Sequence, residues 1–203
     1  MPPGPITHNM NTQIISFLIV SILYSTIGSA DGQVETTKLK DSDFLQYQLQ
    51  CTVDVPIKTV VPEVWSAVLE PSFSAPNETK NILDTKEYEV VIHTYIAMPI
   101  GFDDRDIVIC EKWDHQEDYE GDRISWKVCE RYDTPLSQSF IRIKLSNGSL
   151  LFHSNKNGGT TITITSHTDP GVSLPAFVTN MFAGDRLIDD CLRLRKRIGS
   201  AKE

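Results

Sequence analysis

The arginine at position 105 is the side chain whose type and position most strongly suggest chemistry. With regular strand alternation, Arg105 shares a face with Ile107 and Ile109, which we expect to be the interior of a sheet. A buried arginine is costly without a partner, so two interpretations are open. Arg105 either forms a salt bridge with a neighbouring carboxylate such as Asp106, or it is a charged anchor inside an apolar pocket. In a pocket, its planar guanidinium suits a phosphate, carboxylate or hydroxyl group.

The histidines do not form a recognisable metal or catalytic pattern. His93, His153 and His167 fall on separate predicted strands, and none has a ligand-like partner at metal spacing. The sequence has no glycine-rich phosphate loop, no nucleophile elbow and no spacing that singles out a Ser-His-Asp triad. We therefore expect no metal and no cofactor.

Four cysteines are spread along the chain, and none belongs to a C-x-x-C pair, so zinc and thioredoxin-type sites have no support. If residues 104–114 and 122–132 form a hairpin, one register places Cys110 opposite Cys129 and Trp113 opposite Trp126. Opposed residues on paired strands are close enough to interact. The pattern predicts that Cys110 and Cys129 are neighbours, joined by a disulfide if the protein is exported.

A strand, a short helix and a run of further strands are expected before residue 169. Residues 44–55 alternate apolar and polar side chains, which is typical of a half-buried strand. Pro62 opens a short helix that Pro71 ends, and residues 71–81 are typical of a loop. Asn147-Gly148 and Asn157-Gly158-Gly159 predict tight turns, which favours an antiparallel meander. Its six strands are residues 86–98, 105–114, 123–132, 139–145, 149–153 and 160–168.

A long amphipathic helix is predicted over residues 174–197. Ser173 suits its N-cap, Pro175 its first turn and Gly199 its end. One apolar stripe recurs at three- and four-residue steps, formed by Leu174, Phe177, Val178, Met181, Ile188, Cys191 and Leu192. A helix of this length needs a broad apolar surface to lie on, and the predicted strands can supply it as a curved sheet.

Composition and charge restrict the possible partners. The 203 residues suffice for one domain with a core, and we expect a monomer. The net charge of −8 argues against a nucleic-acid partner. The one concentrated basic run, from Arg193 to Arg197, has two interpretations. It either complements the dipole at the helix end or makes transient contact with an anionic membrane.

The first thirty or so residues stand apart from the rest. The run from Ile14 to Gly28 is apolar and uncharged, but shorter than the roughly 20 residues of a membrane span. Small residues up to Ala30 suit a cleavage site, so we expect residues 1–30 to be a signal peptide. The protein would then be secreted, periplasmic or otherwise extracytoplasmic. The alternative is a membrane anchor formed by residues 14–28.

Two segments resemble the START (steroidogenic-acute-regulatory-related lipid transfer) family. Residues 169–180, Asp-Pro-Gly-Val-Ser-Leu-Pro-Ala-Phe-Val-Thr-Asn, are similar to the family pattern D-P-G-G-x-L-P-x-W-L-V-N at the entry into its last helix. Residues 99–108 end in Arg-Asp-Ile-Val, like the family's R-D-F-V strand start. Val172 and Phe177 depart from the usual glycine and tryptophan, which bears on ligand shape. The resemblance implies an α+β helix-grip fold over residues 34–198, in which a curved antiparallel sheet wraps a long C-terminal helix.

The resemblance implies non-catalytic binding of one lipid or sterol, with or without transfer, in an internal tunnel roofed by the C-terminal helix. Arg105 then corresponds to the family's cavity arginine and orients the polar end of the ligand. The loop residues Met98, Pro99 and Phe102 and the helical Gly184 are expected to act as a gate. The other expected lining residues are Tyr88, Val90, Ile92, Ile107, Ile109, Trp126, Ile141, Ile143, Ile162, Ile164, Phe177, Val178, Met181 and Ile188.

Two other functions remain open. An enzyme that resembles the polyketide cyclases and aromatases could use the same scaffold, with His93, Tyr95, Tyr132 or Glu130 as acid–base groups. Strand alternation places His93 and Tyr95 outside the tunnel, which argues against it. The third possibility is a partner-binding domain whose core is filled.

Overall fold

The structure is a computed structural model that describes residues 33–132, 140–171 and 174–200. The chain divides into two compact units, residues 1–31 and residues 32–203, and only the second contains described residues. The predicted signal peptide or anchor therefore lies outside the described residues. Among the described residues, no helix is long and apolar enough to cross a membrane.

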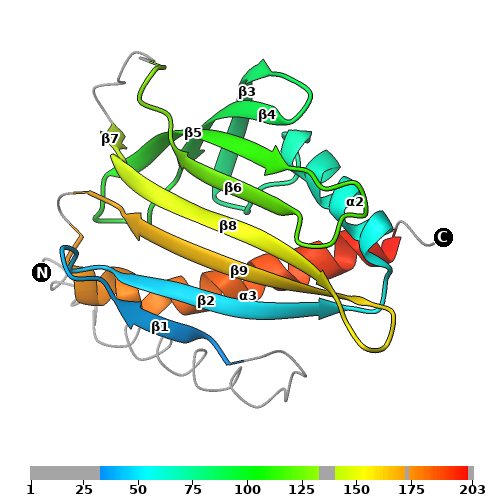
Figure 1. Cartoon of the computed structure of the whole chain (residues 1–203). Coiled ribbons are helices and arrows are strands. Elements are labelled where there is room, and N and C mark those ends of the chain that lie inside the picture. Colours follow the sequence, from blue (N-terminus) through cyan, green and yellow to red (C-terminus); the bar gives the residue numbers. More distant parts are fainter. Residues whose placement is uncertain (1–32, 133–139, 172–173, 201–203) are drawn as a thin grey trace, which may run out of the picture. The chain divides into compact units, whose positions relative to one another are not determined.

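The second unit is an antiparallel sheet with two helices. Its strand order is β1-β2-β9-β8-β6-β5-β4-β3, and β7 pairs in parallel with β5. Both helices lie on the same side of the sheet, with α3 running along it (Figure 1). This is the expected α+β helix-grip fold. The elements are β1 (Glu35–Lys38), β2 (Leu45–Val53), α2 (Ile57–Leu69), β3 (Glu78–Thr85), β4 (Glu89–Ile96), β5 (Asp104–Asp114), β6 (Arg123–Val128), β7 (Phe140–Arg142), β8 (Leu145–Ser154), β9 (Thr160–Asp169) and α3 (Ala176–Ser200).

The core lies between the sheet and the two helices. Tyr47, Leu49 and Cys51 on β2 alternate with more exposed polar residues, as a half-buried strand requires. The helix α2 begins at Ile57, five residues before the predicted start, and Pro62 lies inside it. Val60 and Val61, in the part of the helix that the prediction left out, are fully buried. Tertiary packing of these residues outweighs the hydrogen bond that the proline removes.

One predicted break in the sheet is absent, and another is shorter than predicted. Asn147 and Gly148 do not form a turn but lie inside β8, paired with His167 and Ser166 of β9. The predicted loop of residues 71–81 contains the start of β3, an edge strand in which intermediate and exposed residues alternate. The second turn, at residues 157–159, is confirmed, and Gly158 there has a positive φ. Local turn propensity was therefore overridden where both neighbouring strands supply hydrogen bonds.

The hairpin of β5 and β6 has a different register from the predicted one. Cys110 pairs with Lys127, and Trp113 pairs with Ile124 rather than with Trp126. The predicted disulfide between Cys110 and Cys129 is nevertheless present, with 5.0 Å between the Cα atoms. Cys129 follows the end of β6 and donates its backbone N–H to Val108, so it lies diagonally opposite Cys110. Diagonal neighbours on paired strands are still within reach of each other.

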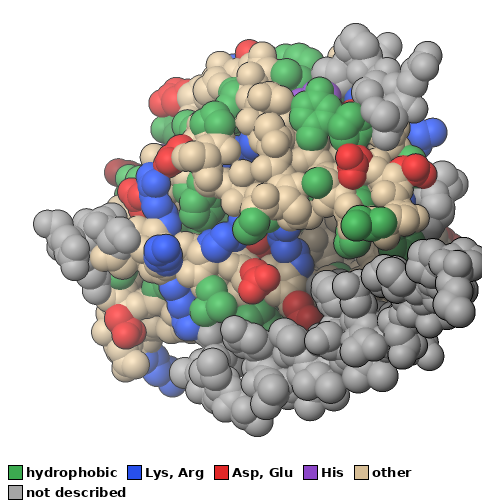
Figure 2. Space-filling view, turned by 180° about the vertical axis from the view of Figure 1, so that it is seen from behind, with side chains coloured by type: hydrophobic (Ala, Val, Ile, Leu, Met, Phe, Trp, Pro, Cys, Tyr) green, Lys and Arg blue, Asp and Glu red, His purple; other side chains and the backbone are tan. Residues whose placement is uncertain are grey.

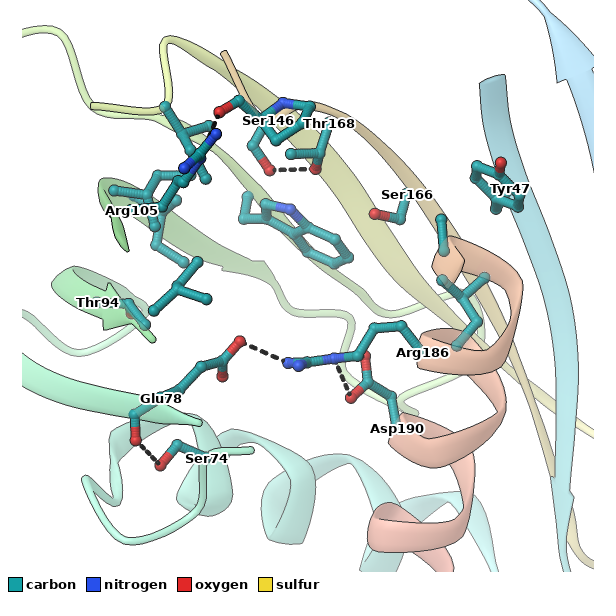
Figure 3. A pocket seen from close by; sticks show the side chains of 18 of the residues that line it. Tyr47, Ser74, Glu78, Thr94, Arg105, Ser146, Ser166, Thr168, Arg186 and Asp190 are labelled. Carbon is teal, nitrogen blue, oxygen red and sulfur yellow. Dashed lines mark hydrogen bonds and ion pairs between the residues drawn. The ribbon is translucent and has the colours of Figure 1, made fainter. Parts of the chain in front are cut away.

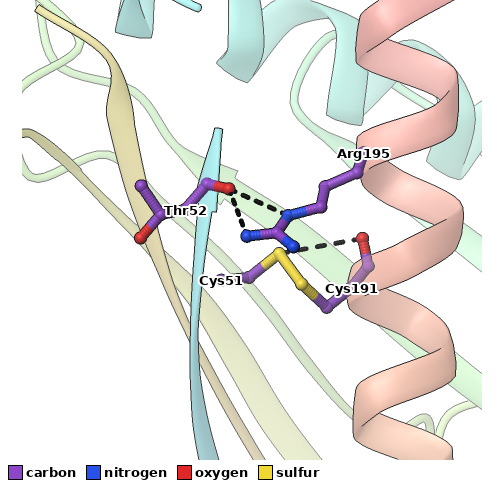
Figure 4. The surroundings of a disulfide bond; sticks show 4 residues. All are labelled: Cys51, Thr52, Cys191 and Arg195. Atoms are coloured by element: carbon purple, nitrogen blue, oxygen red, sulfur yellow. Dashed lines mark hydrogen bonds between the residues drawn. A yellow bond between two sulfur atoms is a disulfide. The ribbon is translucent and has the colours of Figure 1, made fainter. Parts of the chain in front are cut away.

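A second disulfide, which the sequence analysis did not predict, joins Cys51 on β2 to Cys191 on α3 (Figure 4). Its Cα atoms are 5.7 Å apart, and 140 residues separate the two cysteines. One turn further on, the Arg195 guanidinium donates two hydrogen bonds, of 2.9 and 2.7 Å, to the carbonyl oxygen of Thr52. These contacts hold the C-terminal half of α3 firmly against β2.

Candidate functional site

A cavity of about 640 Å³ lies between the inner face of the sheet and the two helices. Its wall is mainly aliphatic and aromatic, with a few polar groups at separate places. Several expected site residues line it: Arg105, Ile92, Ile107, Ile109, Trp126, Ile143, Ile164 and Val178, together with the loop residues Met98, Pro99 and Phe102. For the strand residues among them the expectation agrees with strand alternation, which the antiparallel sheet preserves.

Other expected residues lie away from the cavity. Tyr88 is 36% exposed and packs edge-on against Trp113, with 5.3 Å between the ring centroids. It shares a face with Ile92 but sits at the far end of the sheet. Ile141 on β7 does not line the cavity, and it packs near the Gly171 backbone. Gly184 does not line the cavity, and a Cβ there would meet Val34, so its expected role in a gate stays a prediction.

The expected helix stripe was rotated by about one residue. Phe177 is 72% exposed, and Ile188 and Leu192 also face outwards. The buried positions are instead Leu187, Cys191, Leu194 and Ile198. Cys191 belongs to both patterns, and its disulfide to β2 fixes which side of the helix faces the sheet. The Met181 side chain lies outside the described part of the structure.

Arg105 lines the cavity but has partners in the protein itself. Only 1% of the residue is exposed. Its Nε donates a 3.2 Å hydrogen bond to the carbonyl oxygen of Pro170, and Nη1 donates to the carbonyl oxygen of Asp103. The guanidinium thus ties the start of β5 to the turn that precedes α3 (Figure 3). Its expected role as the anchor of a ligand stays a prediction.

Trp126 forms part of the cavity wall because the residue beside it is a glycine. Gly148 pairs with Trp126 across β6 and β8. A Cβ at position 148 would lie 2.2 Å from Cζ2 of the indole and 2.3 Å from the carbonyl oxygen of Thr165. The indole therefore occupies the space that a side chain on β8 would need. This close approach explains a glycine inside a central strand.

A group of charged side chains also lines the cavity, and the sequence analysis missed it. Glu78 on β3 accepts a 2.8 Å hydrogen bond from Nη2 of Arg186 on α3, and Arg186 also pairs with Asp190 (Figure 3). Burial alone would lower the pKa of Arg186, but the charges of Asp190 and Glu78 outweigh it and raise the pKa. Arg193 donates to Asp190 as well. Acidic and basic side chains lie close together on the side of the molecule that carries the helices (Figure 2).

Lys80 and Glu111 are two further charged residues that line the cavity. The Lys80 amino group donates to the carbonyl oxygens of Ala67, Val68 and Phe73, at 3.3, 2.8 and 3.3 Å. It therefore caps the carbonyl oxygens at the C-terminal end of α2. Burial lowers the pKa of this amino group. Glu111 follows Arg105, Ile107 and Ile109 at every second position of β5. The same alternation that placed Arg105 inside would have placed Glu111 there too.

The candidate acid–base residues of an enzyme are not in the cavity. His93 is buried on the other face of β4, where its Nε2 lies 2.9 Å from Oδ2 of Asp106. Burial alone would raise the pKa of Asp106, but hydrogen bonds from Arg142 and His93 outweigh it and hold the pKa low. The Tyr95 ring packs at a tilt against His93, and the Tyr132 hydroxyl donates to Asp84. Neither these residues nor Glu130 line the cavity. No metal-binding cluster of His, Cys, Asp and Glu occurs in the described ranges.

An α+β helix-grip fold around a mostly apolar cavity defines a class of proteins that bind hydrophobic molecules. The START domain model matches residues 63–203, so the chain belongs to the START family. None of the curated proteins compared with the chain matches it.

Solved structures show the same fold at low sequence identity. A STAR-related lipid transfer protein from Xanthomonas axonopodis superimposes with a TM-score of 0.70 at 17% identity, covering 83% of this chain and 97% of that one. Human STARD10 superimposes with a TM-score of 0.69 at 16% identity, covering 95% of this chain and 81% of that one. The Zhui aromatase/cyclase from Streptomyces sp. R1128 superimposes with a TM-score of 0.53 at 12% identity, covering 77% of this chain and 93% of that one. The scaffold is therefore shared by a protein whose name indicates lipid transfer and by an aromatase/cyclase.

Proposed function

We propose that this START domain binds one lipid or sterol molecule in its cavity, without catalysing a reaction, and releases it at a membrane. The observation that carries the proposal is the cavity itself, because about 640 Å³ of mostly apolar space lies inside the domain. Ligand pockets are commonly about 300–1,000 Å³ and mainly apolar, with a few placed polar groups. A domain that served only as a partner-binding surface would not need to keep this space open.

The ligand enters, in this proposal, beside the loop between β4 and β5. Met98, Pro99 and Phe102 line the cavity, while Ile100 at the tip of the same loop is fully exposed. The hydrogen bonds of Met98 and Phe102 are local, to Asp104 and Pro99. The C-terminal half of α3, by contrast, is tied to β2 by a disulfide. If the loop is the gate, Ile100→Ser should slow uptake of lipid from vesicles while the amount bound at equilibrium stays the same.

Native mass spectrometry tests the binding proposal directly. The domain of residues 32–203 is expressed in a lipid-rich host, purified without detergent and measured intact, and its lipids are then extracted and identified. We expect one lipid per protein molecule. A protein that repeatedly carries no lipid, and also fails to bind the neutral probe Nile red, would show that the cavity is not a lipid site.

An aromatase/cyclase-like reaction is the alternative, because one enzyme shares the fold. Glu111 is the cavity group that supports it, since burial raises the pKa of this carboxyl to about 7 and so suits it to proton transfer. The expected partners, His93 and Tyr95, point away from the cavity. Incubation with linear polyketide thioester mimics decides between the two functions. Cyclised product that disappears in Glu111→Gln would favour the enzyme.

We also propose that the protein works outside the cytoplasm. All four cysteines of the sequence lie in disulfides, and such bonds persist mainly in oxidising compartments. Mass spectrometry of the protein secreted by its own host, after alkylation without reduction, should show four unmodified cysteines and a start near residue 31. Four alkylated cysteines and an intact N-terminus would contradict this location.

A further inference from the structure

Glu111 is the charged group of the cavity that lacks a partner among the described residues. Its carboxyl lines the cavity and makes neither a hydrogen bond nor an ion pair with any of them, and only the charge of Lys80 acts on it from a distance. The other charged side chains there each have at least one partner, although the buried Nε and Nη1 of Arg193 have none among the described residues. Arg186 bonds to Glu78 and Asp190, Arg193 bonds to Asp190, and the Lys80 amino group is used by three carbonyl oxygens. Glu111 is half-buried, and a polar group shielded from water without a hydrogen-bond partner is costly, so its retention calls for an explanation.

The position of Glu111 suits contact with a ligand. It pairs across the sheet with Val90 of β4 and Trp126 of β6, so its neighbours on the cavity wall are largely apolar. Arg105 lies six residues earlier on the same face, roughly 20 Å away at about 3.3 Å per residue. The two residues therefore mark opposite ends of the cavity, and Glu111 is at the end remote from the β4–β5 loop.

Charge around Glu111 disfavours an ionised ligand of either sign. An anionic headgroup would meet Glu111, Glu78 and Asp190. Both arginines there already bond to carboxylates, although Nε and Nη1 of Arg193 have no partner among the described residues. A cationic headgroup would meet Lys80, Arg186 and Arg193. A hydroxyl group avoids both penalties, because it can donate to the ionised carboxylate or accept from the protonated acid. Burial raises the pKa of Glu111 to about 7, so both forms occur near neutral pH and a hydroxyl suits each.

We propose that the Glu111 carboxyl binds the hydroxyl group of a neutral, hydrophobic alcohol whose apolar body fills the rest of the cavity. This assignment rests on the proposed lipid-binding function and names its ligand class. It places the polar end of the ligand at Glu111 rather than at Arg105. The ligand is then held with its hydroxyl in the interior and its apolar body towards the β4–β5 loop.

Four ligands that differ only in their polar end test the assignment. Dodecanol, dodecyl methyl ether, dodecanoic acid and dodecylamine are each used to displace Nile red from the intact domain at neutral pH. We expect dodecanol to compete about tenfold better than the ether, which cannot donate, since one hydrogen bond to a charged group is worth about that factor. The acid and the amine should compete less well than the alcohol.

Variants at position 111 separate this contact from general effects on the cavity. Glu111→Gln keeps the shape and most of the hydrogen bonding, so it should retain most of the preference for dodecanol. Glu111→Leu should abolish the preference while Nile red still binds. Glu87→Gln makes the same chemical change on an exposed residue before β4 and serves as the matched control. Two outcomes overturn the assignment. In the first, the Glu111→Leu variant keeps the preference for dodecanol. In the second, the Leu variant is well folded and Glu111→Gln loses as much of the preference as it does.

The two proposals fail in different ways. If Nile red and co-purified lipids bind but dodecanol has no advantage over the ether, acid and amine, Glu111 is not the hydroxyl contact and lipid binding stands. If neither Nile red nor any lipid binds, the proposed function fails and the assignment of Glu111 fails with it.

Discussion

Each end of the cavity contains a charged residue from the same face of β5. The two residues differ in whether their side chains are hydrogen-bonded within the protein. At the loop end, formed by the β4–β5 loop and the turn before α3, the Arg105 guanidinium is bound to backbone carbonyl oxygens. At the charged end, where β3, β5 and α3 meet, the Glu111 carboxyl has no partner among the described residues. A buried charge whose bonds are used inside the protein stabilises the fold. A buried polar group that is left unpaired is better placed to bind a ligand.

The largest effect is expected from removing the disulfide beside the charged end. The loop closed by Cys51 and Cys191 spans 140 residues and the one closed by Cys110 and Cys129 spans 19. Loop-closure entropy gives about 5 kcal/mol for the first and about 3 kcal/mol for the second. Each disulfide is removed by replacing both of its cysteines with alanine, and urea denaturation measures the loss of unfolding free energy. The loss should be larger for the Cys51–Cys191 pair than for the Cys110–Cys129 pair. Equal losses would mean that α3 is held to β2 by packing alone.

Glu111→Gln should change how stability depends on pH. Burial raises the pKa of Glu111 to about 7 in the folded protein, from 4.5 in the unfolded chain. Below the lower value both states are protonated. Between the two values only the unfolded chain ionises, so the folded protein loses stability as pH rises, and the loss is complete above about pH 7.

The glutamine variant lacks this loss. Its free energy of unfolding should equal that of the original protein near pH 4. At pH 8 it should be higher by about 3 kcal/mol, at about 1.4 kcal/mol per pKa unit. Urea denaturation of both proteins across this range measures the difference, in which all other carboxyl groups cancel. A constant difference at every pH would show that Glu111 has the same pKa in the folded and unfolded states, and the contrast between the two ends would then disappear.

Arg105→Leu tests the loop end. The substitution leaves the carbonyl oxygens of Asp103 and Pro170 without their donor, which should cost about 2 kcal/mol of unfolding free energy. Thermal denaturation measures this loss, and dodecanol displacement measures binding. We expect lower stability with the preference for dodecanol over the ether intact. Unchanged stability together with an altered preference among polar ends would instead make Arg105 the ligand anchor, as the family resemblance implied.

The smallest effect is expected at the ion pair between β3 and α3. The Arg186 side chain is 39% exposed, and such pairs contribute about 1 kcal/mol or less. Arg186→Met should therefore change stability little, and its apolar stem should still cover the cavity. The exchange rate of bound Nile red is the informative readout. Faster exchange would place a second route to the cavity beside this pair, whereas a large loss of stability would show that the pair supports the fold.

The sequence predicted the class of fold and most of the sheet side of the cavity, because alternation on a strand needs no knowledge of its neighbours. Arg105, Ile107 and Ile109 were placed correctly by that rule, and Glu111 was overlooked although the rule applied to it equally. The helix side was less predictable. Phe177 and Ile188 fit a helical period as well as Leu187 does, and only the disulfide at Cys191 determines the rotation.

Turns and registers depended on partners that are distant in sequence. Asn147-Gly148 has strong turn propensity, but its glycine is required inside a strand because Trp126 of the next strand occupies the adjoining space. The pairing of Cys110 with Cys129 was predicted from a register that is wrong, and it holds because Cys129 lies diagonally opposite. These features follow from tertiary contacts, which single-chain patterns do not contain.

The indole over Gly148 gives the protein a built-in fluorescent reporter of whether its cavity is filled. Trp65 and Trp113 are buried in the core, with 5.8 Å between their ring centroids, whereas Trp126 faces the cavity. The emission of Trp126 should therefore shift when the cavity fills or empties, while that of the other two stays constant. Loading and unloading could then be followed in real time without a label, with Trp126→Phe as the blank.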